Sequence, residues 1–209
     1  MIPTPRPPRW LAFAAAAVFL LLALAAAFAP GVDLALAGWS GAHRHPWLTV
    51  FMFHLTQLHR PAGVLVLAAL LVGWMWKDGA RRWALLAGLA IPGGLLLNVL
   101  LKYAFRRARP SVGEPLVNLA SYSFPSGHAN GATLLYLTLA CWLWARLPRG
   151  RARLATAAAL AMIVLVAASR VYLGAHYLTD VLAGMAEGTA WLTICMHLAA
   201  WRQAPRGAG

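Results

Sequence analysis

The chain has 209 residues, of which 61% are hydrophobic and 11% are charged, and its mean hydropathy is +0.66. These values exclude an ordinary soluble globular domain and indicate a membrane protein. Eighteen Lys and Arg against five Asp and Glu give a formal net charge of +13. Because the basic residues lie between apolar segments, they argue against nucleic-acid binding and favour membrane topology and an anionic ligand. Cys141 and Cys195 offer neither a disulfide framework nor metal-ligand spacing.

Six apolar segments are close to the length that crosses a bilayer as a helix. They predict an all-α membrane protein, with one six-helix bundle forming a single domain over residues 1–209. The predicted spans are residues 10–28, 61–76, 83–101, 129–145, 154–169 and 181–201. A secretory signal is the alternative for the first span, since Ala27-Phe28-Ala29 is similar to a cleavage site, but the apolar segment is longer than a usual signal core.

The connection between the first two spans, residues 29–60, mixes histidines with aromatic residues. This composition is typical of a helix that lies at the membrane interface. The alternative is a metal site, for which the sequence shows no supporting second layer of ligands. Its candidate ligands are His43, His45, His54 and His59.

The basic loops set the predicted orientation. Most Lys and Arg, including those of residues 77–82 and 146–153, lie on the side that carries both termini, which makes that side cytoplasmic. Counting the spans then brings three polar segments together at the opposite face. They are the end of the third span, the start of the fourth and the junction of the fifth and sixth.

The first polar segment, residues 102–110, holds four cations on the face that should be poor in them. This predicts a site for an anion, and the alternative is a set of anchors for lipid phosphates. Lys102 and Arg109 are the candidates for the site, whereas Arg106 and Arg107 are expected to contact lipid head groups.

The second polar segment is a Pro-Ser-Gly-His turn, residues 125–128, that runs directly into an apolar helix. Helix N-terminal amides suit an anion, and Gly127 lets the backbone approach it closely. His128 can carry a proton near neutral pH. The alternative is an ordinary loop, with Ser126 as the helix cap and His128 facing water.

The third polar segment, residues 169–180, holds Arg170, His176 and Asp180. If the segment is helical, His176 and Asp180 share one face, where the carboxylate can accept the imidazole Nδ1–H and leave Nε2 as a nucleophile. The alternative is that Asp180 or Thr179 only caps the sixth helix. We expect Asn98 to form an interhelical hydrogen bond, and Glu187 is either functional or a neutral structural carboxyl bonded to Asn98 or a tyrosine.

Together the three segments resemble the type 2 phosphatidic acid phosphatase superfamily, which includes glucose-6-phosphatase and the vanadium haloperoxidases. The motifs are Lys-x6-Arg-Pro in residues 102–110, Pro-Ser-Gly-His in residues 125–128 and Ser-Arg-x5-His-x3-Asp in residues 169–180. The predicted spans argue against a soluble haloperoxidase.

The resemblance implies a role for each motif residue. His176 would attack phosphorus, Asp180 would orient it, and His128 would protonate the leaving oxygen. The phosphate would be held by Lys102, Arg109, Arg170 and the amides near Ser126 and Gly127. Neither a metal nor another cofactor is implied, and five scattered acids, with Asp33 and Asp78 expected on opposite faces, do not easily build a two-metal site.

The implied function is that of a multi-pass lipid phosphatase in a bacterial cytoplasmic membrane, with its active site facing the periplasm or cell exterior. Candidate substrates are undecaprenyl diphosphate, phosphatidylglycerol phosphate and phosphatidic acid. One alternative is a phosphotransferase that uses the same phosphohistidine. Another is a non-catalytic anion-binding or transport protein, which the unbroken spans disfavour.

Overall fold

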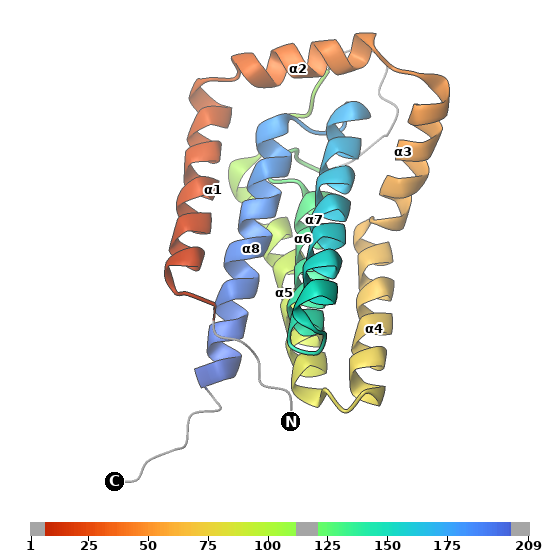
Figure 1. Cartoon of the computed structure of the whole chain (residues 1–209). Coiled ribbons are helices and arrows are strands. Elements are labelled where there is room, and N and C mark those ends of the chain that lie inside the picture. Colours follow the sequence, from red (N-terminus) through yellow and green to blue (C-terminus); the bar gives the residue numbers. More distant parts are fainter. Residues whose placement is uncertain (1–6, 112–120, 202–209) are drawn as a thin grey trace.

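A computed structural model describes residues 7–111 and 121–201. These residues form helices and connecting turns without a strand, which confirms the predicted all-α fold (Figure 1). Residues 1–6, 112–120 and 202–209 lie outside the described residues, and Glu114 is among them. The helices are α1 (Trp10–Phe28), α2 (Gly31–Ala42), α3 (Pro46–Leu58), α4 (Pro61–Lys77), α5 (Arg81–Phe105), α6 (Gly127–Trp144), α7 (Arg149–Tyr172) and α8 (Leu178–Trp201).

Four of the described helices, α1, α5, α7 and α8, are long and apolar enough to cross a membrane. The helices α3 and α4 meet at a 60° bend and together make up to a fifth span. The helix α6 is not among these spans, because its first two turns carry His128, Asn130 and Thr133, which lower its hydropathy. The plan of six spans therefore stays a prediction.

The connection over residues 29–60 differs from the single interfacial helix that we expected. It forms two helices, because Pro46 starts a new helix at its N1 position after α2 has ended at Ala42. Figure 1 shows α2 lying across one end of the bundle, whereas α3 turns down along it toward α4. The interfacial position of this connection stays a prediction.

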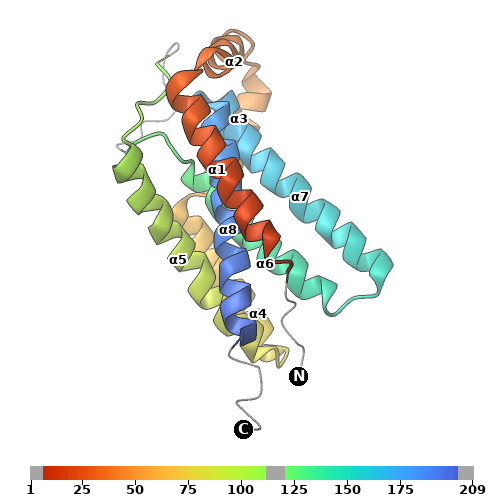
Figure 2. The same cartoon turned by 90° about the vertical axis from the view of Figure 1, so that its left-hand side faces the viewer.

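The helix α6 is the centre of the bundle and packs against α4, α5, α7 and α8 (Figure 2). Every residue from His128 to Leu135 is buried. The main apolar core lies between α4, α5, α6 and α8, where Trp83, Trp142 and Leu134 are fully or almost fully buried. Large apolar side chains on the outside of the bundle remain exposed, as expected for a surface that faces lipid.

The helix α8 approaches the beginning of α6 closely through Gly184. A Cβ atom on Gly184 would lie 2.4 Å from the backbone oxygen of Ser126. The Ser126 amide also donates a hydrogen bond to the Asp180 carbonyl, at 2.9 Å. This contact holds the Pro-Ser-Gly-His turn against the first turns of α8.

We predict that Gly184→Ala destabilises the bundle, because the new methyl group would clash with the backbone of Ser126. Overpacking of this kind typically costs about 1–3 kcal/mol. Thermal unfolding in detergent measures the change. The matched control is Gly73→Ala within α4, where a Cβ atom meets nothing within 4 Å. Equal melting temperatures for the two variants would contradict the close packing.

Candidate active site

The predicted site residues gather at the end of the bundle that α2 covers (Figures 1 and 2). At this end α5 and α7 finish and α6 and α8 begin. The three motifs therefore meet at one end of the bundle, as their order along the chain predicted.

His176 lies in the turn between α7 and α8, so it does not share a helix with Asp180. The turn still brings the imidazole Nδ1 to 3.4 Å from Asp180 Oδ2. Arg109 Nη1 lies 3.3 Å from the other ring nitrogen, Nε2. Because a guanidinium can only donate, Nε2 accepts this contact and the ring proton belongs on Nδ1, facing the carboxylate.

The environment of His176 keeps its imidazole neutral. Burial lowers the pKa of His176 to about 3, against the opposing hydrogen bond and charge of Asp180. The positive charges of Lys102 and Arg170 lower the pKa further. The unprotonated Nε2 is therefore available as a nucleophile at neutral pH.

The Asp180 carboxylate is fully buried and accepts hydrogen bonds from three directions. Ser123 Oγ and the Tyr177 amide donate to Oδ2, at 2.5 and 2.9 Å. Arg107 Nη1 donates to Oδ1 at 2.6 Å. Asp180 is the third residue of α8, so its side chain satisfies the amide just before the helix from within the first turn, in addition to its contact with His176.

Lys102 and Arg109 are held by backbone carbonyls in the segment that precedes α6. Lys102 Nζ donates to Tyr122 O at 2.8 Å, and Arg109 Nε donates to Ser121 O at 2.7 Å. Burial lowers the pKa of Arg109, although the Asp180 charge opposes the shift. Because backbone carbonyls carry no net charge, they do not neutralise Lys102 and Arg109, and both positive charges can still attract an anion.

Arg170 is almost fully buried near the end of α7. Its Nη1 donates to Thr56 Oγ1 at 2.5 Å. Within the described residues its Nε and Nη2 atoms are buried and have no hydrogen-bond partner. Such donors are costly unless a ligand accepts from them, which points to an anion at this position.

The Pro-Ser-Gly-His turn is more enclosed than an ordinary surface loop. His128 is 8% exposed, so the alternative in which it faces water is wrong, and it lies within electrostatic range of His176 and Arg170. Ser126 starts α6 without a side-chain cap, and its amide is used by the Asp180 carbonyl. The amides from Gly127 onward are the part of this helix start that is left for an anion.

We expected Arg107 to contact lipid head groups, but its side chain points into the protein instead. It binds Asp180 and also Asp33, which lies in α2. Burial lowers the pKa of Arg107, but its contacts with Asp33 and Asp180 outweigh burial and raise it. The sequence contained no signal for this pairing, because Asp33 belongs to a different segment of the chain. Ser123 and Thr56 were missed for the same reason.

A second polar cluster lies deeper in the bundle. Asn98 Nδ2 donates to Glu187 Oε2 at 2.7 Å, which confirms the predicted interhelical hydrogen bond. Asn130 Nδ2 donates to the other oxygen of Glu187 at 3.4 Å and to Gly94 O at 2.9 Å. The cluster joins α5, α6 and α8 below the site.

The histidines of residues 43–59 do not form a metal centre. Across residues 7–111 and 121–201, no group of three or more His, Cys, Asp or Glu side chains is placed to hold a metal ion. His59 is instead bonded to Leu55 O through Nδ1 and to the Tyr136 hydroxyl through Nε2, both at 2.8 Å. These bonds occupy both of its ring nitrogens.

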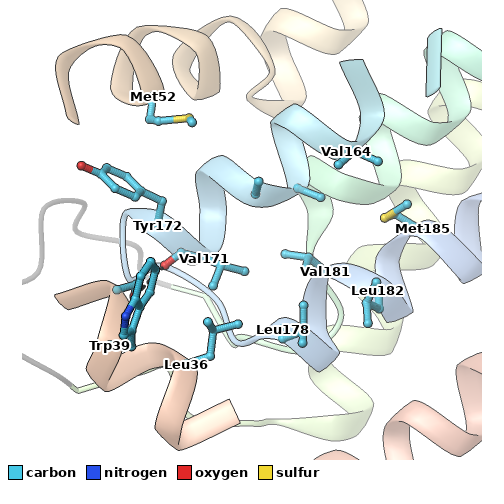
Figure 3. Close-up of a pocket in the computed structure, with 13 residues that line it drawn as sticks. Leu36, Trp39, Met52, Val164, Val171, Tyr172, Leu178, Val181, Leu182 and Met185 are labelled. Atoms are coloured by element: carbon cyan, nitrogen blue, oxygen red, sulfur yellow. Dashed lines mark hydrogen bonds between the residues drawn. The ribbon is translucent and has the colours of Figure 1, made fainter. Parts of the chain in front are cut away.

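An apolar cavity of about 380 Å³ lies between α2, α3, α7 and α8 (Figure 3). Leu36, Trp39 and Met52 line it from α2 and α3. Val171 and Val181 also line it, and each follows directly after a site residue. The cavity therefore borders the site on the side of α2.

The fold and the site define an α-helical membrane protein with a buried cationic site around an oriented histidine. Residues 81–204 match the model of the PAP2 superfamily, and the chain belongs to this family, which confirms the resemblance given by its three motifs. The structural likeness extends over nearly the whole chain.

Among its relatives, phosphatidylglycerophosphatase B of Bacillus subtilis is 37% identical over 147 residues, covering 69% of this chain and 72% of the relative. Undecaprenyl-diphosphatase of Sulfolobus acidocaldarius is 33% identical over 47% of this chain and 46% of the relative. The crystal structure of a transmembrane PAP2 type phosphatidylglycerolphosphate phosphatase from Bacillus subtilis aligns with a TM-score of 0.85 and 31% identity, covering 94% of this chain and 98% of that chain.

We predict that His176 stays neutral throughout the pH range 5–8, because burial lowers its pKa to about 3. NMR of protein labelled with ¹⁵N in histidine should show an Nδ1-protonated ring that does not titrate in this range, with His176→Gln supplying the assignment. A protonation midpoint near ~6.5, the value for an unperturbed histidine, would contradict this environment.

Proposed function

We propose that this protein is a lipid phosphatase that hydrolyses a lipid phosphate monoester or an isoprenoid diphosphate through a phosphohistidine intermediate. The observation that carries the proposal is the position of His176. Its Nδ1–H faces Asp180, and its Nε2 lies beside the Arg109 guanidinium. A nucleophile next to a cation suits attack on an anionic phosphorus centre.

The reaction proceeds in two steps. In the first, Nε2 of His176 forms a bond to phosphorus while the bond to the lipid oxygen breaks, and His128 gives that oxygen a proton. In the second, His128 takes a proton from water, whose oxygen attacks phosphorus and breaks the bond to Nε2. Asp180 stabilises the imidazolium that forms between the steps.

The transferred phosphoryl group carries charge on three equatorial oxygens that must be stabilised in the transition state. Lys102, Arg109 and Arg170 are the cations that would bind them. The Arg170 Nε and Nη2 donors support this assignment, because both are buried without a partner in the described residues. The amides of Ser126 and Gly127 were also predicted to bind phosphate, and of these Gly127 is the better candidate, since the Ser126 amide already donates to Asp180.

We also propose that the reaction needs no metal. In support, each acid of the described residues already contacts a cation or an amide, and two of the acids share Arg107. The pairs are Asp33 and Asp180 with Arg107, Asp78 with Arg146, and Glu187 with Asn98. Rearranging these acids into a two-metal site would break several of the contacts that hold the helices together.

The substrate class follows from the membrane setting and from the relatives, whose names specify phosphatidylglycerophosphate and undecaprenyl diphosphate. Phosphatidic acid belongs to the same chemical class. The apolar cavity beside the site gives a lipid chain a place to lie. We place the protein in a bacterial cytoplasmic membrane, with both termini cytoplasmic and the site open to the periplasm or cell exterior.

Release of inorganic phosphate from a panel of these lipids tests the proposal. His176→Ala should lower turnover by at least ~1,000-fold, because it removes the nucleophile. Wild-type turnover should be unchanged in the presence of a chelator. Undiminished turnover by His176→Ala would contradict the mechanism, and loss of activity with the chelator would contradict the metal-free step.

Water labelled with ¹⁸O distinguishes hydrolysis from phosphotransfer. Hydrolysis of the phosphohistidine places one solvent oxygen in each phosphate that is released, because the water oxygen replaces Nε2 on phosphorus. Mass spectrometry of the released phosphate reads the label. A lipid phosphate product formed with little label in free phosphate would identify a phosphotransferase instead.

A further inference from the structure

Asp33 is a buried acid on the inner side of α2, a helix that has no part in the proposed reaction. Its side chain is 1% exposed, while its neighbours Val32 and Leu34 are exposed. Asp33 Oδ1 accepts a hydrogen bond from the Thr179 amide at 3.0 Å, and Oδ2 accepts one from Thr179 Oγ1 at 2.5 Å. The acid therefore ties α2 to the first turn of α8, immediately before Asp180.

Arg107 links this acid to the candidate nucleophile pair. Its Nη2 donates to Asp33 Oδ2 at 2.8 Å, and its Nη1 donates to Asp180 Oδ1 at 2.6 Å and to Thr179 Oγ1 at 2.8 Å. The guanidinium also lies over the Tyr177 ring, 4.3 Å from its centroid. A planar guanidinium bonded on both nitrogens and stacked on a ring has little freedom to move, so it fixes the carboxylate that it holds.

The order of the charged side chains around Asp180 also affects the electrostatic field at His176. Asp33, Arg107 and Asp180 form a row of negative, positive and negative groups. With Asp33 present, the charge of Arg107 is shared between two carboxylates, so Asp180 keeps negative charge directed at His176. Without Asp33, Arg107 would be left to Asp180 alone and would weaken the field that stabilises an imidazolium.

We propose that Arg107 and Asp33 are positioning residues for the pair formed by His176 and Asp180, and that α2 is thereby part of the catalytic machinery. This inference rests on the proposed phosphatase function. Arg107 sets the position of Asp180, and Asp33 acts through Arg107. Through these two residues α2 contributes to the rate of the reaction without a contact to the phosphoryl group.

The inference predicts a specific kinetic pattern. Asp180 stabilises charge that develops during attack and does not hold the phosphate, so the changes should appear in kcat and leave KM within about twofold. Misplacement of a catalytic group by about 1 Å can cost ~100-fold, and we expect losses in kcat of about 10- to 100-fold for Arg107→Gln and about tenfold for Asp33→Asn.

A double-mutant cycle tests whether Asp33 acts through Arg107. If it does, the variant with both Asp33→Asn and Arg107→Gln should be no slower than Arg107→Gln alone. Arg107→Lys keeps the charge but cannot bridge both carboxylates, so its kcat should lie between those of the wild type and Arg107→Gln. Independent effects that multiply would overturn the proposed order of action.

The matched control is Asp78→Asn, which breaks the ion pair with Arg146 at the opposite end of the bundle. This variant should keep the wild-type kcat. The inhibition constant of inorganic phosphate shows whether the phosphate-binding site is still folded in each variant, because Lys102, Arg109 and Arg170 are unchanged. If Asp33→Asn does not fold, the kinetics of Arg107→Lys test the inference in its place. A lowered kcat with an unchanged inhibition constant for phosphate would then support the inference.

Wild-type kcat in Arg107→Gln, Arg107→Lys and Asp33→Asn would overturn the inference while the proposed phosphatase function stands. Raised KM and weakened phosphate inhibition with unchanged kcat would also overturn it, because Arg107 would then act on substrate binding. If the wild-type protein releases no phosphate from the lipid panel, this result contradicts the proposed function and therefore also the inference that rests on it.

Discussion

The arrangement of the site depends on one buried carboxylate. The Asp180 carboxylate accepts hydrogen bonds from Ser123, the Tyr177 amide and Arg107, and it faces the imidazole of His176. A charged group without water must be paired and hydrogen-bonded, so each of these partners is required to make its burial tolerable. Because Ser123 and Arg107 come from segments far from Asp180 in the chain, satisfying Asp180 also assembles the site.

The surrounding bundle supplies the low-dielectric setting that gives these contacts their strength. Close packing of Gly184 against Ser126 and the dense core around α6 keep water away from the inner side of the site. In this setting Lys102, Arg109 and Arg170 present positive charge that the described carboxylates do not neutralise. The imbalance suits an anionic phosphate better than a neutral ligand.

The sequence predicted the site better than it predicted the connections around it. The motif spacing selected His176, Asp180 and the three cations as candidates, because short stretches that end or begin helices must meet at one face. It could not pair Asp33 with Arg107 or Thr56 with Arg170, since those contacts depend on how separate helices pack. It left open whether the segment of His176 is helical, and the described chain turns there and begins α8 at Leu178.

The sequence predicted the class of membrane protein but not the detailed arrangement of its helices. Apolar composition correctly indicated an all-helical membrane protein, because buried backbone groups in lipid must be bonded within the chain. The length of residues 29–60 could not show that α2 lies across the bundle while α3 bends into α4. The polar start of α6 likewise reflects its role at the site, and hydropathy alone does not reveal how such a helix sits.

The central claim is that His176 carries the phosphoryl group. The most direct measurement is rapid mixing with ³²P-labelled lipid phosphate, followed by an alkaline quench that preserves phosphohistidine and by mass spectrometry of the labelled peptide. We expect a transient phosphoryl group on His176 that forms and decays as fast as the enzyme turns over. Steady turnover with no label on His176, or label on another residue, would contradict it.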